Sequence, residues 1–187
     1  MSSVGDREQR LILDLLLGHK SEEQFCQEFP ADPLQKSALG LSILQTAAKE
    51  RDPVGVEFGL HLGHRFGFLP EYLGTLLALL REDWHERHED VVDGLAELKS
   101  PESVDALCYA ALMELPYRSY DDSGSLAKKC IRLLGKLQSH EAVLRLADLV
   151  RRGSDSVRSA AAAELHRLEL QGHSHSVRLA ARNVLRG

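Results

Sequence analysis

Three His–Glu dipeptides are the residues of this sequence best suited to bind a metal: His85-Glu86, His88-Glu89 and His140-Glu141. Imidazole and carboxylate groups are ligands of zinc and iron. A metal centre built on a repeated helix pair needs its ligands at equivalent positions of the repeat. When the sequence is aligned on itself, His140 falls on Pro101 at the start of one helix, whereas His88 precedes Val91 at the start of the other. The dipeptides are therefore not repeats of one another, and we predict structural or capping roles for them.

Two further pairs of histidines lie close together in the sequence. His61 and His64 are three residues apart, a spacing that suits helix neighbours as well as ligands, and His173 and His175 flank Ser174. Neither pair is followed by a third ligand at an obvious spacing, so we interpret both as solvated. The sequence has no glycine-rich phosphate loop and no GxSxG nucleophile motif. We therefore predict no catalytic residue, no cofactor and no metal, and a protein that is not an enzyme.

Leucine, alanine and valine must form most of the core, because 43% of the 187 residues are hydrophobic but only 5% are aromatic. This composition favours packed helices over sheets. The N-terminal sequence MSSVGDREQR has no signal-peptide pattern, and no apolar run reaches the roughly 18 residues of a membrane span. Three widely spaced cysteines among apolar residues are typical of free thiols in a reducing cytoplasm, where we expect the protein: Cys26, Cys108, Cys130.

The charge is unevenly distributed along the chain. Residues 1–100 carry 18 acidic and 10 basic side chains, whereas residues 101–187 carry 10 acidic and 13 basic ones, which gives the overall net charge of −5. A nucleic-acid binder must neutralise many phosphates, so this balance argues against a specific nucleic-acid partner. The acidic front half instead favours a partner with a basic surface.

The second half of the sequence repeats itself. The segment 95–107 realigns on the segment 134–146, and residues 157–168 carry a third copy of its first part. Apolar residues inside each copy recur at helical spacing. Such internal repetition predicts a solenoid, in which each helix pair buries its apolar face against its neighbours. We expect about eleven helices along the whole chain.

Start signals for helices recur at short intervals. Ser21 to Gln24 form a capping-box pattern, and Asp32 and Asp52 each precede a proline at the first helical position. Asp83 to Glu86 form a further box pattern. Four glycines spaced four residues apart, which cost stability inside a helix, predict the close approach of a neighbouring helix: Gly55, Gly59, Gly63, Gly67.

Three strings resemble HEAT-type repeats of the bilin-lyase-like subclass: RHEDVVDGLAELKSPESVDAL, IRLLGKLQSHEAVLRLADLV and SDSVRSAAAAELHRL, which lie within residues 83–187. The resemblance implies an all-α fold, a HEAT-like α-α superhelix that is a short solenoid of antiparallel helix pairs. Residues 1–82 are expected to add N-terminal helical hairpins to a single α-solenoid domain, 1–187. Val157 and Val177 follow one another too closely to leave room for a full helix pair, so the C-terminal unit is expected to be truncated.

A second, looser resemblance concerns function. The run from Leu79 to Asp90, followed by Tyr120-Asp-Asp122 and Lys128-Lys-Cys130, is similar to a group of small bacterial HEAT-repeat proteins. Some proteins of that group are immunity proteins of secreted toxins. The resemblance therefore implies a protein that binds a toxin domain and covers its active site.

A helix predicted over residues 84–98 carries one candidate binding surface. Trp84 and His88 fall on its apolar face, which places the tryptophan at the inward or groove-lining edge. Arg87 is the one base near the acidic residues of the helix. These acids are open to two interpretations, a solvated polar face or a contact surface for a basic partner: Glu86, Glu89, Asp90, Asp93, Glu97.

The irregular insert from Pro116 to Gly124 is the second candidate surface. Tyrosines give a large contact area at low entropic cost, and acids steer basic partners. The alternative is a tethering loop in which Asp122 or Ser123 caps the next helix. The residues expected to bind a partner here are Tyr117, Tyr120, Asp121 and Asp122.

The sequence thus predicts a non-enzymatic protein-binding module, a bacterial immunity protein that binds and occludes a cognate toxin domain. A HEAT-repeat scaffold or regulatory subunit is the alternative within the same class. A lyase-like or metal-dependent HEAT enzyme is the alternative from another class. A HEAT protein that cradles a DNA duplex is disfavoured, because the chain lacks a dense groove of lysine and arginine.

Overall fold

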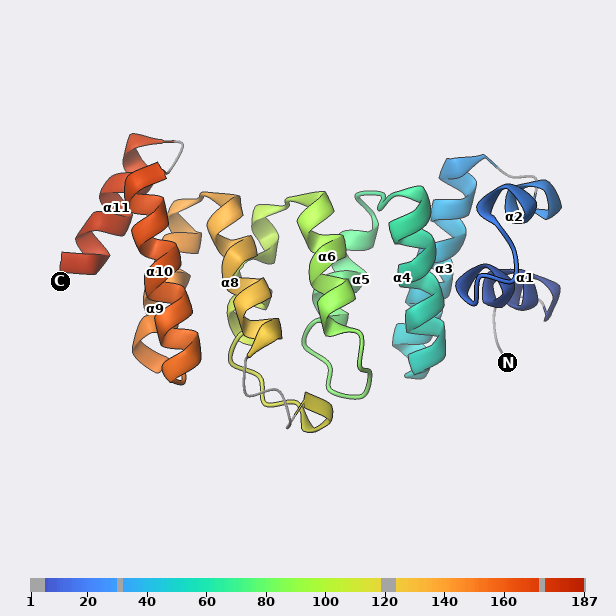
Figure 1. Cartoon of the computed structure of the whole chain (residues 1–187), viewed down its shortest axis with the longest axis horizontal. Helices are drawn as coiled ribbons and strands as arrows, with labels where there is room; N and C mark the ends of the chain where they lie inside the picture. Colours follow the sequence, from blue (N-terminus) through green and yellow to red (C-terminus); the bar gives the residue numbers. More distant parts are fainter. Residues whose placement is uncertain (1–5, 30–31, 119–123, 172–173, 187) are drawn as a thin grey trace. The chain divides into compact units, whose positions relative to one another are not determined.

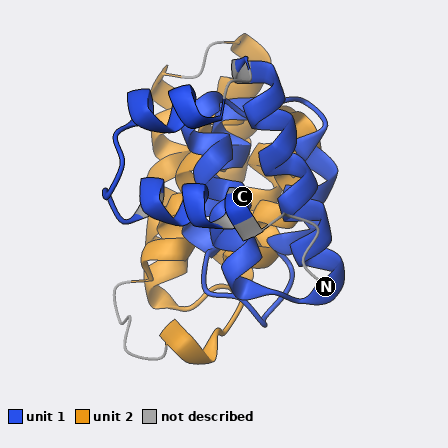
Figure 2. Ribbon diagram, turned by 90° about the vertical axis from the view of Figure 1, so that its right-hand side faces the viewer, with its two compact units in different colours: residues 1–98 blue, residues 99–187 orange. Residues whose placement is uncertain are grey.

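The structure is a computed structural model that describes residues 6–29, 32–118, 124–171 and 174–186. Within these ranges the chain forms eleven α-helices and two short 3-10 helices, and no strand (Figure 1). The all-α class predicted from the leucine- and alanine-rich composition is therefore confirmed. The helices belong to two compact units, residues 1–98 and 99–187, which Figure 2 shows in blue and orange. Whether they form one continuous solenoid domain stays a prediction.

Successive helices pair in unit 1, the N-terminal unit. Helix α1 packs on α2, α3 on α4 and α5 on α6, and further contacts join α3 to α5 and α4 to α6. A cluster of aliphatic and aromatic side chains, which includes Phe25, forms the core between α1, α2, α3 and α4. The helices of this unit are α1 (Asp6–Leu16), α2 (Glu22–Glu28), α3 (Pro33–Glu50), α4 (Pro53–Phe66), α5 (Tyr72–Leu79) and α6 (His88–Leu98).

Three of the predicted start signals cap the helices of unit 1. Ser21 Oγ accepts a hydrogen bond from the Gln24 backbone N–H at 3.2 Å, and the Gln24 side chain accepts one from the Ser21 N–H at 2.8 Å. Asp32 caps α3 through the Gln35 N–H at 2.8 Å, and Asp52 caps α4 through the Val54 N–H at 3.1 Å. Each cap satisfies a backbone donor that the helix leaves unpaired.

Gly55 and Gly59 let α4 approach α3 closely, as predicted, whereas the predicted role of Gly63 and Gly67 is wrong: Gly63 lies against the Phe68 side chain, and Gly67 follows the end of α4 at a φ of 93°. A Cβ atom on Gly59 would lie 2.8 Å from Leu44 Cβ and 2.9 Å from the Gly40 carbonyl oxygen, both on α3. A Cβ atom on Gly55 would lie 2.8 Å from Ala47 Cβ. Gly40, which the sequence pattern did not reveal, is the matching glycine on α3. The two helices therefore meet backbone to backbone.

Unit 2, the C-terminal unit, contains the recognisable repeats. Helix α7 packs on α8 and α9, α9 packs on α10, and α10 packs on α8 and α11. Leu107 and Leu146, which align in the repeat, are both fully buried, as are Leu134 and Leu165. The helices here are η1 (Pro101–Ser103), α7 (Val104–Ala110), η2 (Pro116–Arg118), α8 (Ser125–Leu137), α9 (His140–Arg152), α10 (Asp155–Gln171) and α11 (His175–Arg186).

Val157 and Val177 are each the third residue of a helix, α10 and α11, and both are buried. The interval between them therefore separates two successive helices of one packed pair. None of the helices in the described ranges combines the length and apolarity that crossing a bilayer requires.

Candidate protein-binding surface

The helix predicted over residues 84–98 begins four residues later, at His88. The predicted capping box from Asp83 to Glu86 is therefore wrong. Its residues belong to the connection between α5 and α6, where the His85 side chain is buried and contacts the backbone of the connection. His85 Nε2 lies 2.9 Å from the Leu79 carbonyl oxygen, and the Arg87 N–H donates to His85 Nδ1 at 3.1 Å. Since Nδ1 accepts, the ring proton is on Nε2 and is donated to Leu79.

His88 completes this arrangement from the first turn of α6. Its ring stacks on the His85 ring with centroids 4.4 Å apart, and its Nε2 lies 2.7 Å from the Glu82 carbonyl oxygen. Both imidazoles thus hold the backbone of the connection, which is the structural role that the sequence predicted for them. We call these two side chains the histidine clamp.

The buried position of His85 also affects its protonation. Burial is the main cause that lowers the pKa of His85 from 6.5, and the Leu79 carbonyl and the nearby Glu82 carboxylate oppose it. Burial disfavours the charged imidazolium, so the neutral ring is the form that the fold accommodates.

Trp84 lies in the same connection and not on α6. Its Nε1–H donates to Glu82 Oε2 at 2.8 Å, and its ring meets the His85 ring edge-on at 5.2 Å. The predicted place of Trp84 on the apolar face of a helix is therefore wrong, because the chain is not helical at this point. Glu86 is also in the connection, with an exposed side chain.

Asp90, Asp93 and Glu97 share one face of α6, as their spacing predicted. The Asp90 and Glu97 side chains are 46% and 49% exposed, and Asp93 and Glu89 are half-buried. Helix α4 adds Glu57 next to them, because the Arg87 guanidinium pairs with Glu57 and also lies 3.9 Å from Asp90. We call Glu57, Asp90, Asp93 and Glu97 the acidic face.

Arg87 is not the only base at the acidic face. His64 on α4 lies 3.4 Å from Glu97 Oε1 through Nδ1 and 3.2 Å from the Asp90 carbonyl oxygen through Nε2. Sequence reasoning missed Glu57 and His64 as members of this surface. Their spacing of seven residues, two turns of one helix face, was the available signal.

His61 does not fit the solvated interpretation. It is half-buried, and its Nε2 is shielded from water without a hydrogen-bond partner among the described residues. Burial chiefly lowers its pKa, the positive charges of Arg65 and His64 lower it further, and Glu57 raises it. By contrast His175 and His140 are exposed, and His173 lies outside the described residues.

The predicted binding loop is described in part. Tyr117 is half-buried in η2, and the Arg118 guanidinium lies 5.8 Å from the centre of its ring. Arg118 also donates a hydrogen bond to Ser125 at the start of α8. Tyr120, Asp121 and Asp122 lie outside the described residues.

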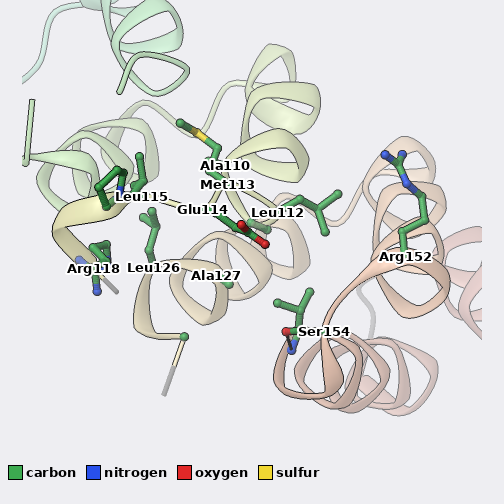
Figure 3. A pocket seen from close by; sticks show the side chains of 14 residues that line it. Ala110, Leu112, Met113, Glu114, Leu115, Arg118, Leu126, Ala127, Arg152 and Ser154 are labelled. Atoms are coloured by element: carbon green, nitrogen blue, oxygen red, sulfur yellow. Dashed lines mark hydrogen bonds between the residues drawn. The ribbon is translucent and has the colours of Figure 1, made fainter. Parts of the chain in front are cut away.

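A pocket of about 640 Å³ opens beside η2 in unit 2 (Figure 3). Residues 110–116, which lie between the end of α7 and the start of η2, form one side of it. Leu112, Leu115 and Leu126 supply apolar walls. The exposed carboxylate of Glu114 projects among the labelled lining side chains, and Arg118 and Arg152 lie at the two sides of the view.

In the described ranges no group of three or more histidine, cysteine, aspartate or glutamate side chains is placed to hold a metal ion. Comparison of the chain with models of protein families, with curated proteins and with solved structures finds no match in any of the three.

Proposed function

We propose that the chain is a protein-binding module whose contact surface is the acidic face. The observation that carries this proposal is the arrangement of Glu57, Asp90 and Glu97 over two neighbouring helices, with Asp90 and Glu97 about half exposed. One guanidinium, from Arg87, serves both Glu57 and Asp90. In these ion pairs three carboxylates, those of Glu57, Asp90 and Glu97, meet one permanent positive charge, which favours a partner with basic groups.

The rigid base of this surface supports a binding role. Asp90, Asp93 and Glu97 lie on a helix whose first turn is fixed by the histidine clamp, and Glu57 lies on α4, which the glycines hold against α3. A surface on packed helices loses little conformational entropy when it binds, so more of the interaction energy remains as affinity.

In this proposal the helix pairs of both units continue one another as a short HEAT-like α-solenoid. The support is the internal repeat that aligns 95–107 with 134–146, and the pairing of successive helices within each unit. Solenoids of this kind present extended surfaces to other macromolecules, so the proposed architecture and the proposed role agree.

The partner that we propose is a toxin domain with a basic surface, and the role is that of a bacterial immunity protein. This part rests on the sequence resemblance of the segments 79–90 and 120–130 to small HEAT-repeat proteins. Neutralisation would be steric: the acidic face, with Tyr117 of the loop as a second contact, covers the active site of the toxin. No chemical step by this chain is needed.

Affinity capture from the native cell tests this proposal. We expect the tagged full chain to recover one basic toxin domain in stoichiometric amount at low salt, and less of it at high salt, because salt screens exposed charge pairs. Co-expression of the chain should then protect cells from that domain. A housekeeping complex in place of a toxin, or a captured domain against which the chain gives no protection, would contradict the immunity role.

A further inference from the structure

Cys26 on α2 and Lys36 on α3 form a close pair outside the acidic face. Lys36 Nζ lies 2.9 Å from Cys26 Sγ. Lys36 is 5% exposed, whereas Cys26 is half-buried and so remains accessible to small solutes. The ring of Phe66 on α4 covers the amine from another side, with its centroid 5.2 Å from Nζ. No atom can fit between the nitrogen and the sulfur at this distance.

The surroundings of Lys36 are unusual for a buried lysine. Buried lysines nearly always have a carboxylate partner, because an unpaired charge is costly to desolvate. Among the described residues no carboxylate lies within ion-pair distance of Lys36, and its polar contact is the Cys26 sulfur. Its place in the first turn of α3 adds the positive end of the helix dipole. The pair therefore brings a nitrogen nucleophile and a sulfur together, with the Phe66 ring as the other neighbour of the amine among the described residues.

We propose that Cys26 and Lys36 are a peroxide-responsive pair that oxidation joins by a covalent sulfur–nitrogen bond. In the first step the Cys26 sulfur attacks one oxygen of hydrogen peroxide. The O–O bond breaks, and the products are a sulfenic acid and water. In the second step the Lys36 nitrogen attacks the sulfur, the S–O bond breaks, and the hydroxyl leaves with a proton from the nitrogen as a second water. Peroxide is the oxidant, and the sulfur is oxidised by two electrons overall.

The other two cysteines are less exposed than Cys26 and serve as internal controls. Cys108 and Cys130 are buried. Burial is the main cause that raises the pKa of the Cys108 thiol, and the Asp148 carboxylate adds to it, so the reactive thiolate is disfavoured there. We expect Cys26 to be oxidised faster than Cys108 by on the order of tenfold.

The experiment treats the full-length protein with hydrogen peroxide and measures mass. The expected product is about 2 Da lighter than the reduced chain, and fragments from a protease that does not cut at lysine contain Cys26 joined to Lys36. Dithiothreitol should restore the original mass. Because the bond closes a short loop between α2 and α3, it should also raise the Tm by roughly 5 °C.

Matched variants separate this pair from general oxidation. Lys36→Met removes the amine but keeps an unbranched side chain, so Cys26 should stop at the sulfenic acid, which dimedone traps. Lys20→Met removes a lysine that precedes α2 and pairs with Glu28, and should still give the cross-link. Sulfinic acid at Cys26 without any cross-link in the wild-type chain would overturn the proposal, and that readout does not depend on a variant.

Discussion

Replacing Gly59 with alanine is expected to lower the free energy of unfolding by about 2–3 kcal/mol, the upper part of the range for an overpacked core. The new Cβ would lie 2.8 Å from Leu44 Cβ and 2.9 Å from both the Leu44 nitrogen and the Gly40 carbonyl oxygen. These atoms belong to the backbone of α3 or sit directly on it, so no side-chain rotation relieves the clash. The two helices must move apart, although alanine itself favours the helix by about 1 kcal/mol.

Gly74 is the matched control for this substitution. It lies inside α5, and a Cβ atom there would meet nothing within 4 Å. Gly74→Ala should therefore raise the free energy of unfolding by about 0.5–1 kcal/mol through helix propensity alone. Urea denaturation of the two variants should show midpoints that move in opposite directions. A Gly59→Ala midpoint at or above that of the wild type would show that α3 and α4 have more room than the structure gives them.

Removing the His85 ring should destabilise unit 1 by about 3 kcal/mol, because a buried carbonyl and a part-buried N–H lose their partner at once. His85→Leu keeps the bulk of the side chain but leaves the Leu79 carbonyl and the Arg87 N–H without a hydrogen bond. His140→Leu is the control, since His140 is exposed at the start of α9 and should change stability by less than about 0.5 kcal/mol.

From the lowered pKa of His85 we also predict how the free energy of unfolding depends on pH. The pKa of His85 is lowered in the folded state, so below the unfolded value of 6.5 the unfolded chain binds more protons. Its contribution is complete above pH 6.5 and is lost as the pH falls below that value. His61, whose pKa is also lowered, acts in the same direction.

Urea midpoints between neutral pH and about pH 5.5 isolate this effect, because carboxylates titrate mainly below that range. The midpoint of the wild-type chain should fall, and that of His85→Leu should fall less. If the two proteins lose stability equally, the His85 ring is not the group that takes up the proton.

The helix caps and the glycine contact could be predicted from sequence because both are local signals. Ser21, Asp32 and Asp52 stand directly before the helices that they cap, and each forms the expected hydrogen bond. The spacing of Gly55 and Gly59 can be seen within the sequence of one helix. It indicates that another helix packs closely there, although it does not identify that helix. The repeat likewise identified leucines that are buried at equivalent positions.

The start of α6 could not be predicted in the same way. Asp83 to Glu86 form an acceptable capping box, and a polar histidine gives no periodic signal that it will be buried. The burial of His85 depends on the Leu79 carbonyl six residues earlier, where α5 ends. Such contacts override a local start signal. As a result α6 begins at His88, and Trp84 and Glu86 lie before it and not on the predicted helix.

Three of the four acids of the acidic face were predicted from the sequence, and Glu57 was not. The acids of α6 follow from helical spacing, but which residues of α4 lie against them depends on how the two helices pack. Glu57 was recognised as part of this surface only from its contact with Arg87, and His64 as its neighbour only from its contact with Glu97. The pocket of unit 2 was not predicted, since it depends on the point at which α7 ends.

The most direct test of the central claim is the association rate of the captured toxin domain with a charge-reversed chain. Asp90→Lys with Asp93→Lys should slow association by on the order of tenfold and weaken binding, with a smaller dependence on salt than the wild type has. Glu50→Lys with Glu102→Lys changes the net charge equally at two exposed acids outside the acidic face, and should leave the rate near that of the wild type. Circular dichroism verifies that both proteins are folded. Equal rates and affinities for the two variants would contradict the claim, because the acids of α6 would then be a solvated surface and no more.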